Sequence, residues 1–174
     1  MHGADVGVGA ETAQRNIQSE ITEMDIVHRI GIKAPASKVY AALATIEGLA
    51  GWWTQGTSGS SKVGGRIDFR FHDTAGADIG GFGMDVLELA PEQSVRWRVN
   101  NGPQEWVDTD IEFLLSREDD YTIVMFGHRK WREQVPFMAH CSTKWATFLM
   151  SLRDLVETGQ GKPAPNDVKV SNWH

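Results

Sequence analysis

Hydrophobic and polar residues alternate along six segments of the chain, a pattern typical of strands with one buried face. The clearest is Val95-Arg96-Trp97-Arg98-Val99, in which apolar and basic residues strictly alternate. We expect strands at 25–33, 66–71, 82–88, 95–99, 107–115 and 121–131. Because short turn sequences separate the last five of these segments, an antiparallel meander is the most economical topology.

Three other segments have apolar residues at the three- and four-residue spacing of a helix. The longest begins at Pro136, a residue tolerated in a first helical turn, and is closed by Gly159. Two short helices are expected at 36–45 and 46–53. The Gly- and Ser-rich segment 54–65 predicts a mobile loop, and it lacks the Gly-Lys-Ser/Thr ending of a phosphate-binding P-loop.

This order of elements predicts an α+β fold. The apolar face of a curved antiparallel sheet must be covered, and the C-terminal helix is the only predicted element large enough to cover it. A sheet wrapped around one helix rarely packs flat along its whole length, so we expect a cavity between the two. The predicted organisation is a flexible leader at 1–24, one domain at 25–160 and a C-terminal tail at 161–174.

Composition excludes several classes of protein. With 174 residues, 41% of them hydrophobic and 23% charged, the chain has enough apolar side chains for a packed core. A net charge of −6 argues against a nucleic-acid-binding face, and no apolar run approaches the ~20 residues of a membrane span. The single Cys141 excludes an intrachain disulfide, and the first residues do not resemble a secretion signal. The expected location is the cytoplasm.

Several short motifs occur in a characteristic order. They are Ile32-Lys33-Ala34-Pro35-Ala36-Ser37-Lys38-Val39-Tyr40, Gly51-Trp52-Trp53-Thr54, Gly64-Gly65 followed by Phe69 and Phe71, Val95-Arg96-Trp97, and Cys141-Ser142 with Trp145, Leu149, Ser151 and Leu152. Over residues 25–158 this order resembles the activator of Hsp90 ATPase homologue-like family of the SRPBCC, or START-like, superfamily. The resemblance implies the helix-grip fold, a curved antiparallel sheet wrapped around a long C-terminal helix with two small helices after the first strand.

The resemblance implies a fold and leaves the activity open. The superfamily includes lipid carriers, cyclases, hydroxylase domains and hormone receptors, so its fold does not determine one function. Cochaperones of this family carry an additional N-terminal domain that the sequence does not show. We therefore do not expect stimulation of a heat-shock ATPase to transfer to this chain.

Seven Trp residues stand against only two Tyr residues, and rigid indole rings are suited to lining a pocket for a flat or apolar ligand. Trp97 lies on the inward face of its predicted strand, and Trp145 lies on the inward face of the long helix. The candidate ligand-binding residues are Trp53, Phe69, Phe71, Met84, Trp97, Trp106, Phe113, His128, Trp131, Cys141 and Trp145. The alternative is that these side chains only fill the core.

Histidine and cysteine side chains are the first candidates for chemistry. His128 is expected on an inward strand face, where it would be either a titratable group at the cavity mouth or a hydrogen-bonded structural residue. His140 and Cys141 are adjacent in the sequence and would point about 100° apart on a helix, so they do not easily share one centre. We expect no metal site and no cofactor.

Acidic residues are the second candidates. Glu105 precedes Trp106 and could reach the cavity as a general acid or base, although no second carboxylate converges with it. Asp108 and Asp110 lie opposite the apolar face of their segment, so we expect both in solvent.

The leading hypothesis is a small-molecule-binding domain that holds an apolar or aromatic ligand between the sheet and the C-terminal helix. One alternative is an enzyme of the cyclase, dehydratase or hydrolase type that uses the same cavity, with His128 or Glu105 as its catalytic residue. Another is a module that interacts with a chaperone. A homodimer is a further expectation, whereas nucleic acid and membrane insertion are not expected.

Overall fold

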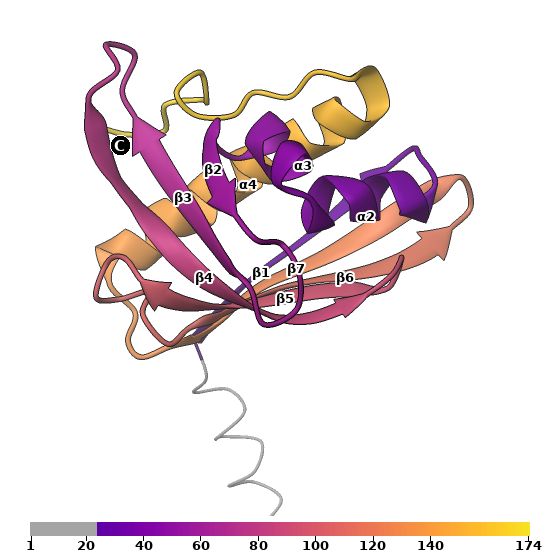
Figure 1. Ribbon diagram of the computed structural model, residues 1–174, viewed down its shortest axis with the longest axis horizontal. Helices are drawn as coiled ribbons and strands as arrows, with labels where there is room; N and C mark the ends of the chain where they lie inside the picture. The colour runs from indigo at the N-terminus through magenta and orange to yellow at the C-terminus, as the bar shows by residue number, and fades with distance from the viewer. Residues whose placement is uncertain (1–23) are drawn as a thin grey trace, which may run out of the picture.

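A computed structural model describes residues 24–174, and its elements confirm the predicted α+β helix-grip fold (Figure 1). In chain order they are β1 (Met24–Ile32), α2 (Ala36–Ala44), α3 (Ile46–Trp52), β2 (Gly56–Gly59), β3 (Arg66–His72), β4 (Asp78–Ala90), β5 (Ser94–Asn101), β6 (Asp110–Glu118), β7 (Tyr121–Trp131) and α4 (Pro136–Thr158). The leader expected at 1–24 lies outside the described residues except for Met24.

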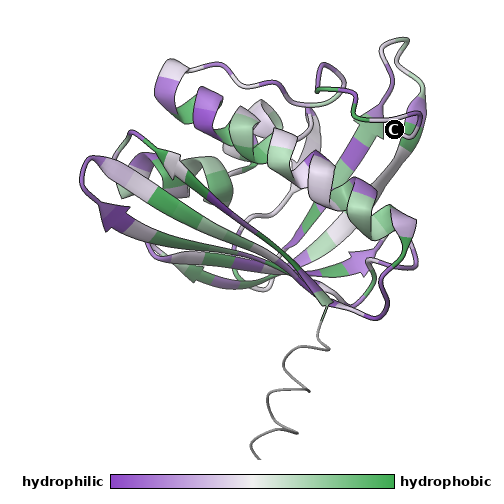
Figure 2. Ribbon diagram, turned by 180° about the vertical axis from the view of Figure 1, so that it is seen from behind, coloured by the Kyte–Doolittle hydropathy of each residue, from purple (hydrophilic) through white to green (hydrophobic). Residues whose placement is uncertain are grey.

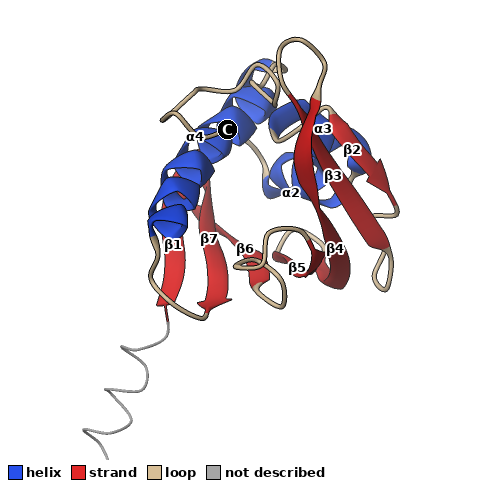
Figure 3. Ribbon diagram, turned by 90° about the vertical axis from the view of Figure 1, so that its left-hand side faces the viewer, coloured by secondary structure: helices blue, strands red, loops and turns tan. Residues whose placement is uncertain are grey.

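The seven strands of the described residues form one antiparallel sheet in the order β1-β7-β6-β5-β4-β3-β2. The strands from β2 to β7 follow one another as a meander, and β1 joins the far edge beside β7, where Ile30 pairs with Val124. Hydrophobic and hydrophilic residues alternate along the strands, as Figure 2 shows. The sheet curls, and helices α2, α3 and α4 lie on its inner side (Figure 3).

The long helix α4 lies across the inner face of the sheet. Pro136 occupies its first turn, and Gly159 ends it with a φ of 86°, a left-handed conformation that favours glycine. Its inward face buries Cys141, Trp145, Phe148, Leu149, Ser151 and Leu152. The Nε2 atom of His28 lies 3.1 Å from the carbonyl oxygen of Ser142, which ties β1 to this helix.

The prediction of a mobile loop at 54–65 is wrong for residues 56–59, which form the edge strand β2. Glycine allows this pairing because β2 lies very close to the backbone of β3. A Cβ atom on Gly56 would be 2.4 Å from the carbonyl oxygen of Arg70, and one on Gly59 would be 2.3 Å from that of Arg66. The strand is therefore held by main-chain pairing and leaves no hydrophobic alternation in the sequence.

The solvent position expected for Asp110 is also wrong, whereas Asp108 is exposed. The Asp110 side chain is only 5% exposed because Arg98 and Lys130, on the neighbouring strands, extend over it. Arg98 Nε lies 2.8 Å and Lys130 Nζ 2.9 Å from its carboxylate oxygens. Burial by itself would raise the pKa of Asp110, but these two hydrogen bonds outweigh it and hold the pKa below its ordinary value.

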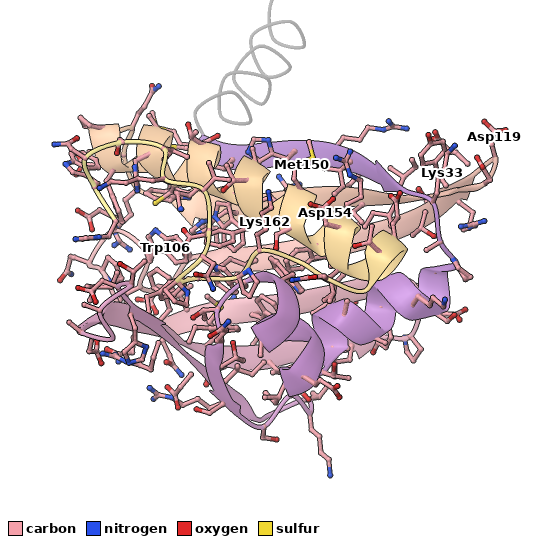
Figure 4. All side chains as sticks on the ribbon, turned by 90° about the horizontal axis from the view of Figure 1, so that it is seen from above. Lys33, Trp106, Asp119, Met150, Asp154 and Lys162 are labelled. Atoms are coloured by element: carbon pink, nitrogen blue, oxygen red, sulfur yellow. The ribbon has the colours of Figure 1, made fainter. Side chains whose placement is uncertain are left out.

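The C-terminal residues 161–174 run back along α4. The backbone N–H of Ala164 donates to the carbonyl oxygen of Trp53 at 2.8 Å, and that of Lys162 donates to Ser151 Oγ at 2.7 Å. Figure 4 shows Lys162 close to Met150 and Asp154 of this helix. Among residues 24–174, no helix is both long enough and apolar enough to pass through a bilayer.

Candidate functional site

The candidate ligand-binding side chains meet between the sheet and α4, where they form a central group and an end group. The central group comprises Trp53, Phe69, Phe71, Met84, Trp97, Phe113 and Trp145. The end group comprises Trp106, His128, Trp131 and Cys141. All of these residues are buried except Phe71, which is half-buried.

Trp53 is the centre of the first group. Its ring centroid lies 4.3 Å from that of Phe69, 4.9 Å from that of Trp145 and 6.2 Å from that of Trp97. The Trp53 and Trp97 planes differ by only 6°. These rings contact one another directly and thereby fill the middle of the interior.

Trp106 closes the end of the interior, on the turn between β5 and β6. Its ring stacks on Phe82 at 4.1 Å, and its indole N–H donates to Cys141 Sγ at 3.4 Å. Arg132 holds this turn from outside by donating to the carbonyl oxygens of Val107, at 2.8 Å, and of Gln104. In Figure 4 Trp106 lies at the opposite end of the molecule from Lys33 and Asp119. The Trp106 side chain therefore covers the end of the interior from a turn and not from a strand of the sheet.

His128 is fully buried in the end group, and both of its ring nitrogens have partners. Nδ1 accepts the indole N–H of Trp145 at 3.2 Å, and Nε2 lies 2.8 Å from Thr109 Oγ1. The Thr109 hydroxyl donates to the carbonyl oxygen of Trp106, so Nε2–H is the donor toward Thr109. Burial lowers the pKa of His128 to about 3, and the nearby Asp110 carboxylate opposes this only in part. The imidazole is therefore neutral at pH 7.

Cys141 packs as a small hydrophobic side chain that also accepts a hydrogen bond. Burial raises the pKa of its thiol to about 12, and the hydrogen bond from Trp106 only partly offsets that effect. Since the thiolate is the nucleophilic form, a thiol that stays protonated at pH 7 is poorly suited to act as a nucleophile. His140 lies on another face of α4, where its Nδ1 atom is 3.1 Å from Ser171 Oγ.

A hollow of about 140 Å³ opens beside the end group. It is lined by Gln104, Glu105, Trp131, Arg132 and Glu133. The indole Nε1 of Trp131 is buried and has no hydrogen-bond partner among the described residues, and Glu105 is half-buried at the hollow. An unpaired buried donor carries a free-energy cost of about 1–3 kcal/mol, which an acceptor atom at this position would remove.

A second hollow, of about 180 Å³, lies on the other side of α4, between this helix and the C-terminal segment. Its lining residues are Thr147, Phe148, Met150, Ser151, Asp154, Lys162, Asp167 and Val168, none of which was a candidate from the sequence. Within the described residues, no three His, Cys, Asp or Glu side chains are grouped so that they could hold a metal ion.

The sequence did not identify Phe82, Thr109 or Arg132 as residues that contact the end group or hold it in place. Phe82 belongs to the inward side of a predicted strand, so its alternation was a usable signal. Thr109 and Arg132 act through hydrogen bonds to distant partners. Thr109 contacts His128, 19 positions away, and Arg132 contacts Val107 and Gln104, 25 and 28 positions away. No local sequence pattern predicts hydrogen bonds between residues so far apart in the chain.

Known proteins resemble this chain in sequence and in fold. The family model for activator of Hsp90 ATPase homolog 1-like protein matches residues 33–157. The solution structure of the Aha1 dimer from Colwellia psychrerythraea is 44% identical, with 79% of this chain and 99% of that chain covered and a TM-score of 0.70. None of the curated proteins with which the sequence was compared matches it.

More distant solved structures share the fold alone. Protein SSP2350 from Staphylococcus saprophyticus is 19% identical, with 79% of this chain and 95% of that chain covered and a TM-score of 0.63. The crystal structure of CalU16 from Micromonospora echinospora is 20% identical, with 79% and 78% covered and a TM-score of 0.62. With its family match and its 44% identical relative, the chain belongs to the activator of Hsp90 ATPase homolog 1-like family of the SRPBCC superfamily.

Proposed function

We propose that this domain binds an apolar, planar small molecule at the end of its interior that Trp106 closes. The observation that carries the proposal is the end group itself, where Trp106 covers aromatic surface from a turn. Beside it lies the indole N–H of Trp131, which has no partner among residues 24–174. Ligand pockets combine apolar walls with a few placed polar groups, and the end group has this composition.

Entry of a ligand requires the Trp106 turn to move outward. The surface that its indole leaves is formed by Phe82, Trp145, His128 and Cys141. A planar aromatic ring can take the same stacked position on Phe82, with apolar burial as the driving force. Because His128 is neutral, this surface presents no charge and favours an uncharged ligand.

Indole N–H signals in ¹⁵N spectra provide the test, because each Trp residue reports separately. We expect 2-acetylnaphthalene to shift the Trp106 and Trp131 signals in a saturable way and to leave that of Trp173, in the C-terminal segment, unchanged. Equal small shifts of all signals, or none, would overturn the proposal.

A matched pair of probes tests the role of Trp131. The unpartnered N–H should favour 2-acetylnaphthalene over 2-ethylnaphthalene, which has a similar shape but no carbonyl, by about tenfold. The Trp131→Phe variant should bind both probes alike. If the native protein also binds both alike, the polar part of the site is wrong while the apolar part stands.

Catalysis by His128 is not part of this proposal. Both ring nitrogens hydrogen-bond within the protein, which leaves neither for a substrate. Within the proposal His128 positions Trp145 and leaves the surface beneath Trp106 uncharged, and Glu105 lines the hollow beside it.

Self-association is the second property that we propose. The relative from Colwellia psychrerythraea, at 44% identity over 79% of this chain, was solved as a dimer. We expect this chain to sediment as a dimer in analytical ultracentrifugation. A monomer at every protein concentration would contradict this expectation and would not affect the proposed ligand site.

A further inference from the structure

Of the helices in residues 24–174, none lies over the outer face of the sheet (Figure 3). Part of this outer face is apolar. Along β7 the outward positions are Tyr121, Ile123, Met125 and Gly127. A Cβ atom on Gly31 would meet the side chains of both Tyr121, at 2.9 Å, and Ile123, at 3.5 Å. These two side chains therefore lie together on this outer face, over the bare backbone of β1.

Neighbouring strands widen this apolar row. Met125 is paired with Leu114 of β6, and Val27 of β1 is paired with Gly127, next to Met125 on the same face. Val27, Leu114 and Met125 are exposed by 48%, 46% and 37%. We call this set the β7 stripe; it consists of the exposed Val27, Leu114, Tyr121 and Met125 and of Ile123, which is only 5% exposed.

Away from the β7 stripe, the outer face of the sheet carries charged side chains. On β3 and β5 the outward positions carry Arg66, Asp68, Arg96 and Arg98. Isolated apolar side chains are common on protein surfaces, whereas a contiguous set on three paired strands is typical of an interaction surface. The apolar surface is therefore confined to one part of the sheet.

Charges of both signs lie within and beside the β7 stripe. Arg29 of β1 is the strand partner of Met125, and its ion pair with Glu118 of β6, at 2.7 Å, crosses β7. Farther along the same face Arg129 contacts both Asp25, at 2.8 Å, and Glu112. A strongly acidic or basic partner would meet like charges here. A second copy carries the same mixture and can match it after a two-fold rotation, since an isologous interface is self-complementary.

The β7 stripe is smaller than a standard protein–protein interface, so a dimer contact must also bury surface around it. At ordinary strand spacings it extends about 20 Å along the strands and about 14 Å across them, or about 300 Å². A standard interface buries about 800 Å² per partner. The ion pairs of Arg29 and Arg129 would therefore lie inside the contact together with the apolar side chains.

We propose that two copies of this chain associate through the β7 stripe, with Met125 near the centre of the contact. This inference rests on the homodimer proposed above and assigns its surface. The flexible thioether of methionine suits a contact in which two copies must adapt to each other.

Two methionines allow a matched test. Met125→Lys places a charge in the β7 stripe, and Met150→Lys places the same charge on the outer side of α4, where Met150 is 44% exposed. By analytical ultracentrifugation we expect Met125→Lys to raise the dimer dissociation constant at least tenfold, a change on the order of a central contact residue. Met150→Lys should dimerise like the native protein, and near-ultraviolet circular dichroism should confirm that both variants keep their packed Trp residues.

The outcomes separate the two levels of the proposal. A native protein that stays monomeric overturns both the homodimer and its surface. A native dimer that Met125→Lys leaves intact overturns the surface alone. As an independent readout, methionine methyl spectra with a soluble paramagnetic agent should show Met125 protected in the dimer and Met150 broadened, and equal broadening of both would also overturn the assignment.

Discussion

The indole N–H of Trp145 donates to Nδ1 of His128 at 3.2 Å, which joins the middle of α4 to β7 inside the aromatic interior. The second ring nitrogen lies 2.8 Å from Thr109 Oγ1, so the imidazole links the helix, the last strand and the turn that carries Trp106. A buried polar group is tolerated when its hydrogen bonds are satisfied, and this arrangement requires the neutral form of His128.

The stability of the fold should therefore decrease in mild acid. The unfolded chain binds a proton on His128 below a pH of about 6.5, while the folded chain does so only near pH 3. The contribution of His128 is present above pH 6.5 and is lost as the pH falls toward 3. We expect the free energy of unfolding to fall by up to about 1.4 kcal/mol per pH unit in this window, measured by urea denaturation.

The control for this prediction is His128→Gln, which cannot titrate. Its free energy of unfolding should be lower than that of the native protein at pH 7 but should change much less between pH 6 and pH 4.5. Parallel curves for the two proteins would show that His128 does not cause the pH dependence. The pKa of Asp110 is below its ordinary value of 3.8, so its stabilising contribution is intact across this window and is lost only at lower pH.

Asp110→Asn should destabilise the protein by about 2 kcal/mol at pH 7. The change removes one charge from a site where Arg98 and Lys130 both contact a buried carboxylate, and the two cations stay partly exposed to water. Glu88→Gln is the matched control because its partner Arg96 is 3.6 Å away and both side chains are about half exposed. Chemical denaturation should show a change below about 0.5 kcal/mol for it, and equal losses would contradict the prediction.

Ser151→Ala should loosen the C-terminal segment. The Ser151 hydroxyl donates to the carbonyl oxygen of Trp52 at 2.8 Å and accepts the backbone N–H of Lys162 at 2.7 Å. Its loss should cost about 1–3 kcal/mol and speed hydrogen exchange at Lys162. Thr143→Ala, which removes an exposed hydroxyl of the same helix, is the control and should leave that exchange rate unchanged.

Arg132→Ala should expose the single cysteine. Trp106 covers Cys141, so alkylation of the folded protein at pH 8 should be at least about 100-fold slower than in urea. Without the two hydrogen bonds from Arg132, the Trp106 turn should open more often and alkylation should accelerate. The exposed Arg66→Ala variant should react like the native protein. An unchanged alkylation rate for Arg132→Ala would mean that Arg132 does not hold Trp106 over Cys141.

The sequence by itself determined the elements whose side chains repeat at a regular spacing. Val95, Trp97 and Val99 predicted a one-sided strand, and all three are buried in β5. The start of α4 at Pro136 and its end before Gly159 were likewise predicted from local signals. These patterns depend on neighbours two to four positions away, and the same order of motifs also identified the family.

Tertiary structure decided what depends on distant partners. Gly56 lies in a strand because the backbone of β3 passes beside it, and Asp110 is buried because Arg98 and Lys130 fold over it. Local sequence patterns also could not predict the hydrogen bonds that neutral His128 makes with Thr109 and Trp145. Periodicity records which face of an element is apolar, whereas pairing depends on which residues the folded chain brings together.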